Sequence, residues 1–512
     1  MSLNSILFIS NTITKPLERE LKEFNITHAP LDTIFITLNE KCSADVIVIL
    51  LTTDFLLTNS VTLLKNALVT FREKNSSKII INNAVGTFFN ISQNIVDEKQ
   101  KKLTTLNSTL SSLKISDLSI LDLFTISLQY GLHNILNEKN SYLFQTPFTK
   151  QGYNLIAKEI KKAILLFNTK RIKVIAIDAD NTLWGGIIGE DGIDGISCDR
   201  NYPGIVYTKF QERLLSLKKS GIILILLSKN NEADLAEVFE KKSMPLNLDD
   251  FVAKKVNWNS KSENLVEVLK EINITKDDVI FLDDSNNEIE EMKSRLAIKC
   301  YKMNPENPID NLKTIESIIE LRTLHISDED KKKSQLYADE SKRTALDLTL
   351  NSKDEYIKSL NIEISCKLND ISKIDRITQL INKTNQFNLT TIRLNTQEVE
   401  KIMSKNSLYS FSVKDKFGDM GLVGVLIIQA QTITNFLMSC RVLGREIEQS
   451  VIAYVCSLYT ELKASYKPTS KNSLAETFYE SNGFELIKDS GEKRYNLKTK
   501  KSINKHIKVA HC

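Results

Sequence analysis

The chain has 512 residues, of which 42% are hydrophobic, so it is long enough for about three domains with sizeable cores. Its 68 basic and 64 acidic residues leave a net charge of only +4, and no basic stripe is interleaved with aromatic residues, which argues against a nucleic-acid binder. Seven scattered cysteines without a Cys-x-x-Cys pair predict neither a zinc cluster nor a disulfide framework. With no signal-peptide pattern and no apolar run of membrane-spanning length, we expect a soluble cytoplasmic protein without a membrane partner.

Residues 1–168 form the first expected domain. Short apolar runs at 6–10, 45–51 and 78–82 alternate with helical stretches, which is the pattern of an α/β domain. Ser10 stands at the end of the first run.

The second expected domain, 169–322, contains the most informative segment of the chain. The apolar run 174–177 leads into Asp178-Ala-Asp180-Asn-Thr182, so two carboxylates two residues apart point the same way at a strand end. Two close carboxylates ionise comfortably only with a cation or proton between them. The pair therefore predicts a site for magnesium and a phosphoryl group, and the alternative is an Asp-rich turn that caps a helix.

Two further apolar runs of this domain end in polar side chains. The run 222–227 is followed by Ser228, and the run 278–282 is followed by Asp283 and Asp284. Helical stretches separate the runs, as in a doubly wound sheet, where the carboxyl ends of neighbouring strands converge on one crevice. We therefore expect these side chains to meet Asp178 and Asp180.

The order Asp-x-Asp-x-Thr, Ser, Lys, Asp-Asp resembles the haloacid dehalogenase (HAD) superfamily of phosphotransferases. The resemblance implies that Asp178 is the nucleophile that takes up a phosphoryl group and that Asp180 is the general acid/base. A lysine would offset the phosphoryl charge, and we favour Lys261 over Lys254 because it opens the helix before the third strand. The implied phosphate ligands are Thr182, Ser228 and Lys261, and the implied Mg²⁺ ligands are Asp178, Asp180, Asp283 and Asp284.

Two motifs narrow the resemblance to the FkbH-like proteins of secondary-metabolite and polyketide gene clusters, over essentially the whole chain. They are Trp184-Gly-Gly-Ile-Ile-Gly-Glu-Asp-Gly192 and Asn257-Trp258. The glycine spacing predicts a tight flap over the site, with a simple hairpin as the alternative. The short spacings between Thr182, Ser228 and Lys261 leave no room for a cap domain. We therefore expect an open site that can accept a macromolecular substrate.

In FkbH-like proteins the first domain resembles a degenerate SGNH hydrolase, and Ser10 stands where such an enzyme has its nucleophile. The Asp-x-x-His expected before the last helix is absent from residues 146–152. A serine hydroxyl without an adjacent base is a weak nucleophile. We expect residues 1–168 to pack or recognise rather than catalyse.

The remainder divides into a linker, a third domain and a tail. The charged stretch 328–343 has helix-forming composition and predicts a helical linker, 323–350, with a solvated face and no catalytic task. The third domain is expected at 351–500, followed by a tail, 501–512.

The third domain contains an apolar strand that leads into an Arg-x-x-Gly-Arg sequence and then a helix, whose amino-terminal N–H groups can bind an anion. With the later segment 471–484, it resembles a GNAT acyltransferase domain, where this pattern binds the pyrophosphate of coenzyme A. The second glycine of that pattern is Glu446 here, and a carboxylate repels a pyrophosphate. The phosphopantetheine arm of a carrier protein has one phosphate fewer and suits Glu446 better. The implied ligands of the arm or coenzyme are Arg441, Gly444, Arg445 and Asn472.

Other polar residues of this domain allow two interpretations. Asn385, Gln386 and Asn388 either contact a ligand or hydrogen-bond their own loops. Tyr479 either protonates a leaving thiolate or packs beneath its helix. Cys440 follows an apolar strand and is expected to be a buried core thiol.

The FkbH-like resemblance implies Mg²⁺-dependent phosphate removal coupled to loading of a glyceryl-type acyl group from 1,3-bisphosphoglycerate onto an acyl-carrier protein. Such enzymes are expected to hold the acyl group on a cysteine, commonly between the two aspartates, where this chain has Ala179, and Cys198 is the nearest substitute. One alternative is a HAD-type phosphatase that acts on a small phosphorylated metabolite or a carrier-bound intermediate. A second alternative is a GNAT-type acyltransferase. A scaffold with a decayed site is disfavoured by the intact aspartates.

Overall fold

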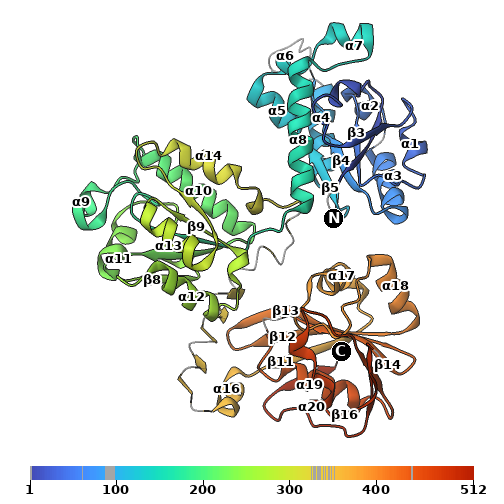
Figure 1. Ribbon diagram of the computed structural model, residues 1–512, viewed down its shortest axis with the longest axis vertical. Coiled ribbons are helices and arrows are strands. Elements are labelled where there is room, and N and C mark those ends of the chain that lie inside the picture. The colour runs from blue at the N-terminus through green and yellow to red at the C-terminus, as the bar shows by residue number, and fades with distance from the viewer. Residues whose placement is uncertain are drawn as a thin grey trace. The chain divides into compact units, whose positions relative to one another are not determined.

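The computed structural model contains three separate β-sheets (Figure 1). It describes residues 3–59, 61–86, 98–324, 326, 330, 336–337, 339–340, 342–343, 346–347, 349–350, 352–439, 442–489 and 491–511. The chain forms two compact units, Met1–Ile172 with Lys313–Ser327, and Lys173–Leu312 with Asp328–Cys512. The first sheet lies in the first unit and the other two lie in the second. The protein thus belongs to the multidomain α/β class, and the domain boundaries proposed above stay predictions.

The first sheet has five parallel strands in the order β2-β1-β3-β4-β5. They span β1 (Ser5–Ser10), β2 (Asn25–His28), β3 (Val46–Leu50), β4 (Lys78–Asn82) and β5 (Leu118–Leu121). The helices are η1 (Lys15–Leu17), α1 (Ile34–Thr37), α2 (Thr53–Thr58), α3 (Val61–Lys74), α4 (Glu98–Ser111), α5 (Leu123–Tyr130), α6 (Leu132–Ile135), α7 (Glu138–Phe144) and α8 (Lys150–Asn168). Strands β1, β3 and β4 match the expected apolar runs. Strand β2 was not expected, because its residues are half-buried or exposed at the sheet edge.

The second sheet also has five parallel strands, in the order β10-β9-β6-β7-β8. They span β6 (Val174–Ile177), β7 (Ile223–Ser228), β8 (Ala253–Val256), β9 (Val279–Asp283) and β10 (Lys299–Lys302). The helices are α9 (Ile188–Gly195), α10 (Gly204–Lys219), α11 (Glu232–Lys241), η2 (Leu248–Asp250), α12 (Lys261–Glu271), η3 (Lys276–Asp278), α13 (Asn286–Leu296), α14 (Ile309–Ser317) and η4 (Ile319–Leu321). The chain starts at the central strand β6 and extends the sheet first on one side and then on the other. The switch point of this topology therefore lies beside β6.

Burial on both faces explains why the central strands are continuously apolar. Every residue of β6 is fully buried, as are those of β7 apart from a trace of exposure at Ser228. Helices α12 and α13 pack their apolar sides on one face of the sheet, and Figure 1 shows α10 on the other side. Between β6 and β7 the chain forms only α9 and α10, and between β7 and β8 only α11 and η2. Since all residues of 169–322 are described, the prediction that no cap domain is inserted is confirmed.

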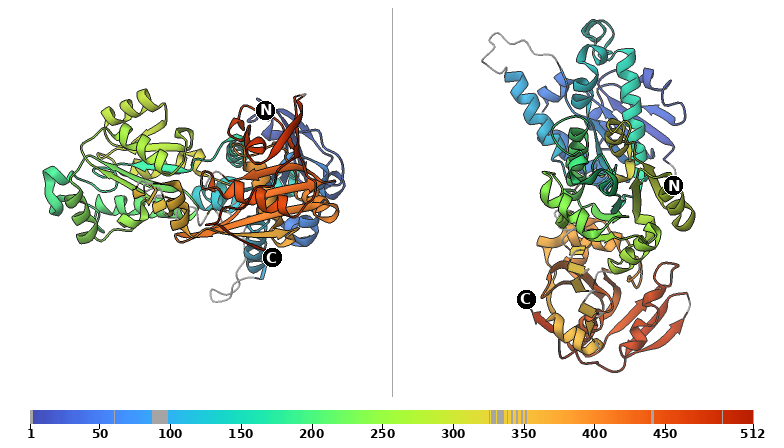
Figure 2. Two further views of the ribbon diagram at one scale, coloured as in Figure 1. Left: turned by 90° about the horizontal axis from the view of Figure 1, so that it is seen from below. Right: turned by 90° about the vertical axis from the view of Figure 1, so that its left-hand side faces the viewer.

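The third sheet has eight strands in the order β16-β17-β15-β14-β13-β12-β11-β18, and Figure 2 shows it from two further sides. They span β11 (Glu363–Leu368), β12 (Ser407–Asp415), β13 (Gly418–Gln429), β14 (Thr432–Met438), β15 (Lys463–Tyr466), β16 (Phe484–Asp489), β17 (Lys493–Leu497) and β18 (Lys508–His511). The helices are α16 (Lys353–Leu360), η5 (Ile371–Lys373), α17 (Ile374–Lys383), α18 (Thr396–Lys405), α19 (Ile447–Ser457), η7 (Ser473–Ala475) and α20 (Phe478–Ser481). Strand β18 pairs in parallel with β11, so the sheet extends past residue 500, where we expected a tail.

Most of the predicted helical linker, 323–350, lies outside the described residues. Arg343, one of its described residues, is almost fully buried and donates two hydrogen bonds to the Asp415 carboxylate, at 2.6 and 2.8 Å. The expectation of a purely solvated charge run is therefore wrong at Arg343, because its guanidinium makes a bidentate ion pair inside the protein. Among the described residues, no helix is long and apolar enough to cross a membrane.

Candidate active site

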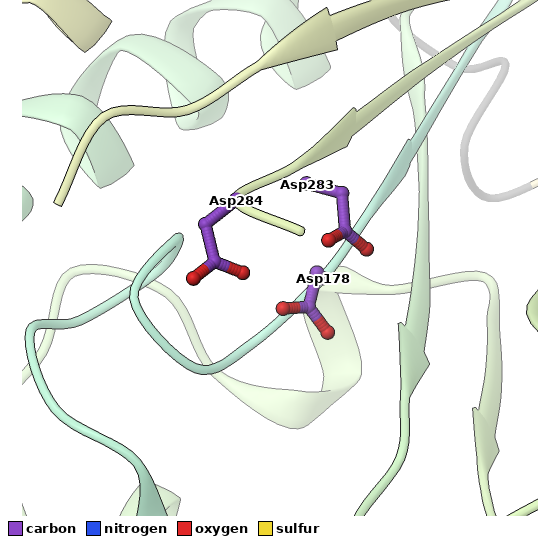
Figure 3. A group of neighbouring side chains, drawn as sticks. All are labelled: Asp178, Asp283 and Asp284. Carbon is purple, nitrogen blue, oxygen red and sulfur yellow. The ribbon is translucent and has the colours of Figure 1, made fainter. Parts of the chain in front are cut away.

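The predicted site residues of the second sheet lie at the carboxyl ends of its three central strands. Asp178 directly follows β6, Ser228 ends β7 and Asp283 ends β9, while Lys261 is the first residue of α12. The parallel pairing of β6 with β7 and β9 places these ends side by side at the switch point. Figure 3 shows Asp178, Asp283 and Asp284 grouped there.

A buried lysine joins two of the carboxylates. Lys261 Nζ lies 2.6 Å from Asp178 Oδ1 and 2.7 Å from Asp283 Oδ2, and all three side chains are buried. Of the other lysines in this stretch, Lys254 donates weakly to the Leu248 carbonyl, at 3.4 Å. Lys255 pairs with two glutamates on the surface. The structure thus brings Lys261, rather than its neighbours, to the aspartates.

Three carboxylates are close enough to share a cation. One oxygen each of Asp178, Asp283 and Asp284 lies within 4.8 Å of the others (Figure 3). Burial raises the pKa of Asp178 to about 8, and it also raises the pKa values of Asp283 and Asp284. Lys261 opposes this shift but does not cancel it at Asp178. Ionising these carboxyl groups is costly unless a cation compensates their charge. Because Mg²⁺ prefers oxygen ligands, the group fits this cation.

Asp180 lies outside this group of three carboxylates, although we predicted it among the metal ligands. Its Oδ1 accepts hydrogen bonds from Trp184 Nε1 at 3.0 Å and from the Ile188 N–H at 3.2 Å, and its Oδ2 accepts one from Asn230 Nδ2 at 2.9 Å. These bonds fix the carboxylate beside the site, as a general acid/base requires. The same Asn230 amide lies 2.9 Å from Ser228 Oγ. Sequence reasoning missed Asn230, although it follows β7 in the polar run that begins with Ser228.

The predicted phosphate ligands Thr182 and Ser228 are buried at the same edge of the sheet. Thr182 Oγ1 has no hydrogen-bond partner among the described residues, although the side chain is fully buried. A buried hydroxyl without a partner is unfavourable, so it suits a ligand oxygen that completes its hydrogen bonding. The assignment of the phosphate-binding role to Thr182, Ser228 and Lys261 stays a prediction.

The glycine-rich segment after Thr182 forms a compact flap. Gly185 and Ser197 exchange two backbone hydrogen bonds, at 3.0 and 2.8 Å, and so close the intervening residues, which include α9. A Cβ at Gly185 would lie 2.9 Å from the Tyr207 ring, which explains the absence of a side chain there. Gly186 has a φ of 102°, which favours glycine. The segment 185–197 is therefore a loop closed at its base that contains the helix α9, and it is not a simple hairpin.

Magnesium is expected to bind more weakly as the pH falls below about 8. Because burial raises the pKa of Asp178 to about 8, a proton competes with the metal for this carboxylate, and each pH unit below that value weakens binding by up to about tenfold. The measurement is the midpoint of a Mg²⁺ titration, followed by thermal unfolding, at about pH 6, 7 and 8.5. An affinity independent of pH over this range would show that Lys261 keeps Asp178 ionised.

Ser10 of the first sheet has no catalytic geometry. Its hydroxyl is buried, lies 2.7 Å from the Thr12 carbonyl and 2.8 Å from the Leu50 carbonyl, and accepts a hydrogen bond from the Thr12 N–H at 2.9 Å. No histidine or carboxylate is among these partners. The serine hydroxyl therefore holds the loop after β1, and the expectation that this domain does not catalyse stays a prediction.

In the third sheet, strands β14 and β15 separate after a short parallel contact. They pair only at Thr432–Lys463 and Ile433–Ala464. Beyond that point the segment 387–389 lies between them. Its main chain exchanges two hydrogen bonds with β14, at 2.9 and 3.0 Å, and accepts one from the Lys467 N–H at 2.8 Å. The protein's own chain thus occupies the edge of β14 that faces β15.

Two carboxylates surround the amino terminus of α19, where we considered an anion site. The Gly444 N–H donates to Glu448 Oε1 at 3.3 Å, and burial raises the pKa of Glu448. Glu446 adopts a φ of 58°, which favours glycine, and accepts a hydrogen bond from Asn504 at 2.7 Å. Neither the charge nor the engaged N–H group suits a pyrophosphate.

Three other residues of this domain were predicted as ligands: Arg441, Arg445 and Asn472. Arg441 lies outside the described residues, as does Cys440. Arg445 is buried and pairs with Glu340. Asn472 is fully buried; its amide donates to the carbonyls of Asn388 and Lys467, at 2.9 and 3.0 Å. These contacts engage Arg445 and Asn472 within the protein, whereas we expected them at a ligand.

The structure also shows the surroundings of Asn388 and Tyr479, whose roles the sequence left open. Asn388 is fully buried, and its side chain bonds the main chain of its own loop at Thr384 and Thr391, at 3.2 and 2.8 Å. Tyr479 is fully buried, and burial raises its pKa well above the usual value. The contacts of Asn388 favour the interpretation that it hydrogen-bonds its own loop, and the burial of Tyr479 favours packing beneath its helix.

Coenzyme A is not expected to bind this protein at concentrations up to about a millimolar. The edge of β14 is occupied, and the carboxylates of Glu446 and Glu448 oppose a pyrophosphate. Isothermal titration with acetyl-coenzyme A is the direct measurement. Binding with a dissociation constant in the micromolar range, lost when the cofactor is replaced by an analogue without the pyrophosphate, would contradict this expectation.

Comparisons with known proteins found similar solved structures. No family model matches the chain, and no curated protein matches it. The N-terminal part of the protein BF1531 from Bacteroides fragilis, which contains a phosphatase domain and was solved with Mg, is 24% identical, covers 63% of this chain and 94% of its own, and has a TM-score of 0.46. An acetyltransferase from Thermus thermophilus is 14% identical over 27% of this chain and 97% of its own, with a TM-score of 0.20. A HAD family enzyme from Bacteroides thetaiotaomicron, in complex with magnesium and inorganic phosphate, is 18% identical over 28% of this chain and 98% of its own, with a TM-score of 0.20. Both a phosphatase and an acetyltransferase, the two kinds of domain expected from the sequence, are thus among the similar structures.

Proposed function

We propose that this chain is an FkbH-like enzyme of the HAD superfamily that removes a phosphoryl group with the help of Mg²⁺. The observation that carries the proposal is the group of Asp178, Asp283 and the half-buried Asp284, with the buried Lys261 between the first two. Phosphoryl transfer needs positioned charge more than it needs other chemistry, and this group supplies it at the switch point of a parallel sheet.

In the proposed reaction, the position of each residue determines its role. Asp178 attacks the phosphorus, and the leaving group departs in line with it. Asp180, oriented by Trp184 and Asn230, donates a proton to the leaving oxygen and then takes one from water. Lys261 and the Thr182 and Ser228 hydroxyls hold the phosphoryl oxygens. Mg²⁺ bound by Asp178, Asp283 and Asp284 would supply charge neutralisation.

We further propose that the substrate is an acyl phosphate of the type of 1,3-bisphosphoglycerate and that the acyl group passes to an acyl-carrier protein. Ala179 occupies the position between the aspartates, and Cys198 is buried with a raised pKa, so neither offers a reactive thiol. The thiol of the carrier's phosphopantetheine arm would therefore attack the acyl carbon directly and release the C1 phosphate as inorganic phosphate, while Asp178 would take up the phosphoryl group of the C3 ester, so that a glyceryl group stays on the carrier. The absence of a cap leaves room for this protein partner.

Phosphate release from 1,3-bisphosphoglycerate, with and without an acyl-carrier protein, tests both levels of the proposal. Mass spectrometry of the carrier reports the transfer. A gain of one glyceryl unit that depends on the enzyme and Mg²⁺ would support the loading reaction. Release without a mass gain would leave the alternative of a phosphatase that acts on a small metabolite. No release from this compound or from a panel of phosphate esters would refute the proposal.

A further inference from the structure

The second sheet's domain exposes two large aromatic side chains, and both belong to the edge that holds the site. In the fully described range 169–322, the exposed large hydrophobic residues are Tyr202, Trp258 and Ile309. Trp258 lies between β8 and α12, and Tyr202 lies just before α10. Helices of a parallel sheet begin at the carboxyl edge of its strands, so both aromatic rings belong to the loops at the mouth of the site.

The loop that carries Trp258 is held by several hydrogen bonds, although this residue is 70% exposed. The Asn257 N–H donates to the Ser228 carbonyl at 3.1 Å. The Asn257 side chain accepts hydrogen bonds from the buried Asn264 at 2.8 Å and from the Asn259 N–H at 3.0 Å. A fixed loop that displays its largest apolar side chain to water loses little entropy when that side chain packs on a ligand.

Trp258 also contacts the loop after β7, whose Asn230 side chain hydrogen-bonds the proposed general acid/base, Asp180. Its Nε1 lies 3.4 Å from Asn231 Oδ1. The preceding residue, Asn230, bonds both Asp180 and Ser228. The indole therefore contacts the residue next to Asn230, which hydrogen-bonds Asp180 and Ser228, and it lies on the solvent side of them.

We propose that Trp258 determines specificity by packing against the part of the substrate that extends outside the phosphoryl pocket. This inference rests on the proposed function. Because no cap domain is inserted in 169–322, the leaving group is recognised at the rim, and Trp258 is the largest exposed hydrophobic side chain of this range. The substrate class is a phosphate ester or acyl phosphate whose leaving group, or whose attached carrier arm, presents a flat or apolar face at the rim.

The test compares two substrates in the full-length enzyme with Mg²⁺. Acetyl phosphate has a leaving group too small to reach the rim, whereas p-nitrophenyl phosphate has a planar one. We expect Trp258→Ala to raise the KM for p-nitrophenyl phosphate about tenfold, with kcat unchanged within about twofold and acetyl phosphate turnover unaffected. Trp258→Phe should recover most of the loss, and Tyr142→Ala, which removes an exposed ring of the first unit, is the matched control. Equal effects on both substrates, or no effect on either, would overturn the inference while leaving the phosphatase activity intact.

Tryptophan fluorescence provides a readout that does not require turnover. The chain has two tryptophans, and Trp184 is fully buried, so acrylamide quenching reports Trp258. We expect phenylphosphonate with Mg²⁺ to protect Trp258 from quenching, and methylphosphonate to give no protection. Equal quenching with both compounds would overturn the inference. An inactive wild-type enzyme would refute the proposed function, and the quenching result would then decide the role of Trp258 by itself.

Discussion

Asp178→Asn is expected to reduce Mg²⁺-dependent phosphate release by at least about a thousandfold, because the amide cannot form the phosphoryl bond that starts the reaction. The side chain also supplies one of the three oxygens that lie within 4.8 Å of each other, so the variant should bind Mg²⁺ more weakly. Release of inorganic phosphate at saturating Mg²⁺ is the measurement.

The same variant is expected to fold as stably as the wild type at neutral pH without metal. Burial raises the pKa of Asp178 to about 8, so the metal-free protein favours the protonated carboxyl, which asparagine resembles in size and charge. Asp277→Asn, which alters an exposed carboxylate of the same domain, is the matched control and should keep full activity. Retention of more than about a tenth of the wild-type rate by Asp178→Asn would exclude Asp178 as the nucleophile.

The strands that position the site were predictable because they are buried on both faces. Strands β6, β7 and β9 are central, so their sequences are continuous apolar runs, which can be identified as strands without knowing the neighbouring strands. Strands β8 and β10 lie at the edges, where lysines can face water, and their sequences, Ala-Lys-Lys-Val and Lys-Cys-Tyr-Lys, carry no comparable signal. The convergence of Asp178, Ser228 and Asp283 followed from the general rule for parallel sheets and did not require the strand order.

Side-chain direction was the part that sequence patterns could not supply. Asp180 was assigned to the metal because it lies two residues from Asp178, but the chain turns after β6 and directs its carboxylate to Trp184 and Asn230. In the third domain, Arg445 and Asn472 have the residue types of anion ligands, yet both are buried against protein partners. A motif indicates which residue types are near a loop, whereas packing decides which of them face a ligand.

Lys261→Met is expected to damage both stability and activity, by different mechanisms. Lys261 contacts both Asp178 and Asp283, so its removal leaves two buried carboxyl groups without a compensating positive charge. We expect the metal-free variant to lose about 3 kcal/mol of unfolding free energy at neutral pH. Without the lysine, both carboxyl pKa values rise further, and a carboxyl with a raised folded-state pKa loses stability as the pH increases. Because the pKa of Asp178 is already about 8 in the wild type, the additional loss from this residue should develop as the pH rises above about 8, as measured by chemical denaturation.

Saturating Mg²⁺ should restore much of this stability, because the cation replaces the charge that the lysine supplied to the same two carboxylates. It should not restore activity, since the lysine's contact with the phosphoryl oxygens is lost, and we expect phosphate release to stay at least about a hundredfold below the wild type. Lys255→Met is the matched control, because Lys255 pairs with glutamates on the surface and its loss should change neither quantity appreciably. A variant that regains stability and full activity together would show that Lys261 serves the folded structure alone and that another group neutralises the phosphate.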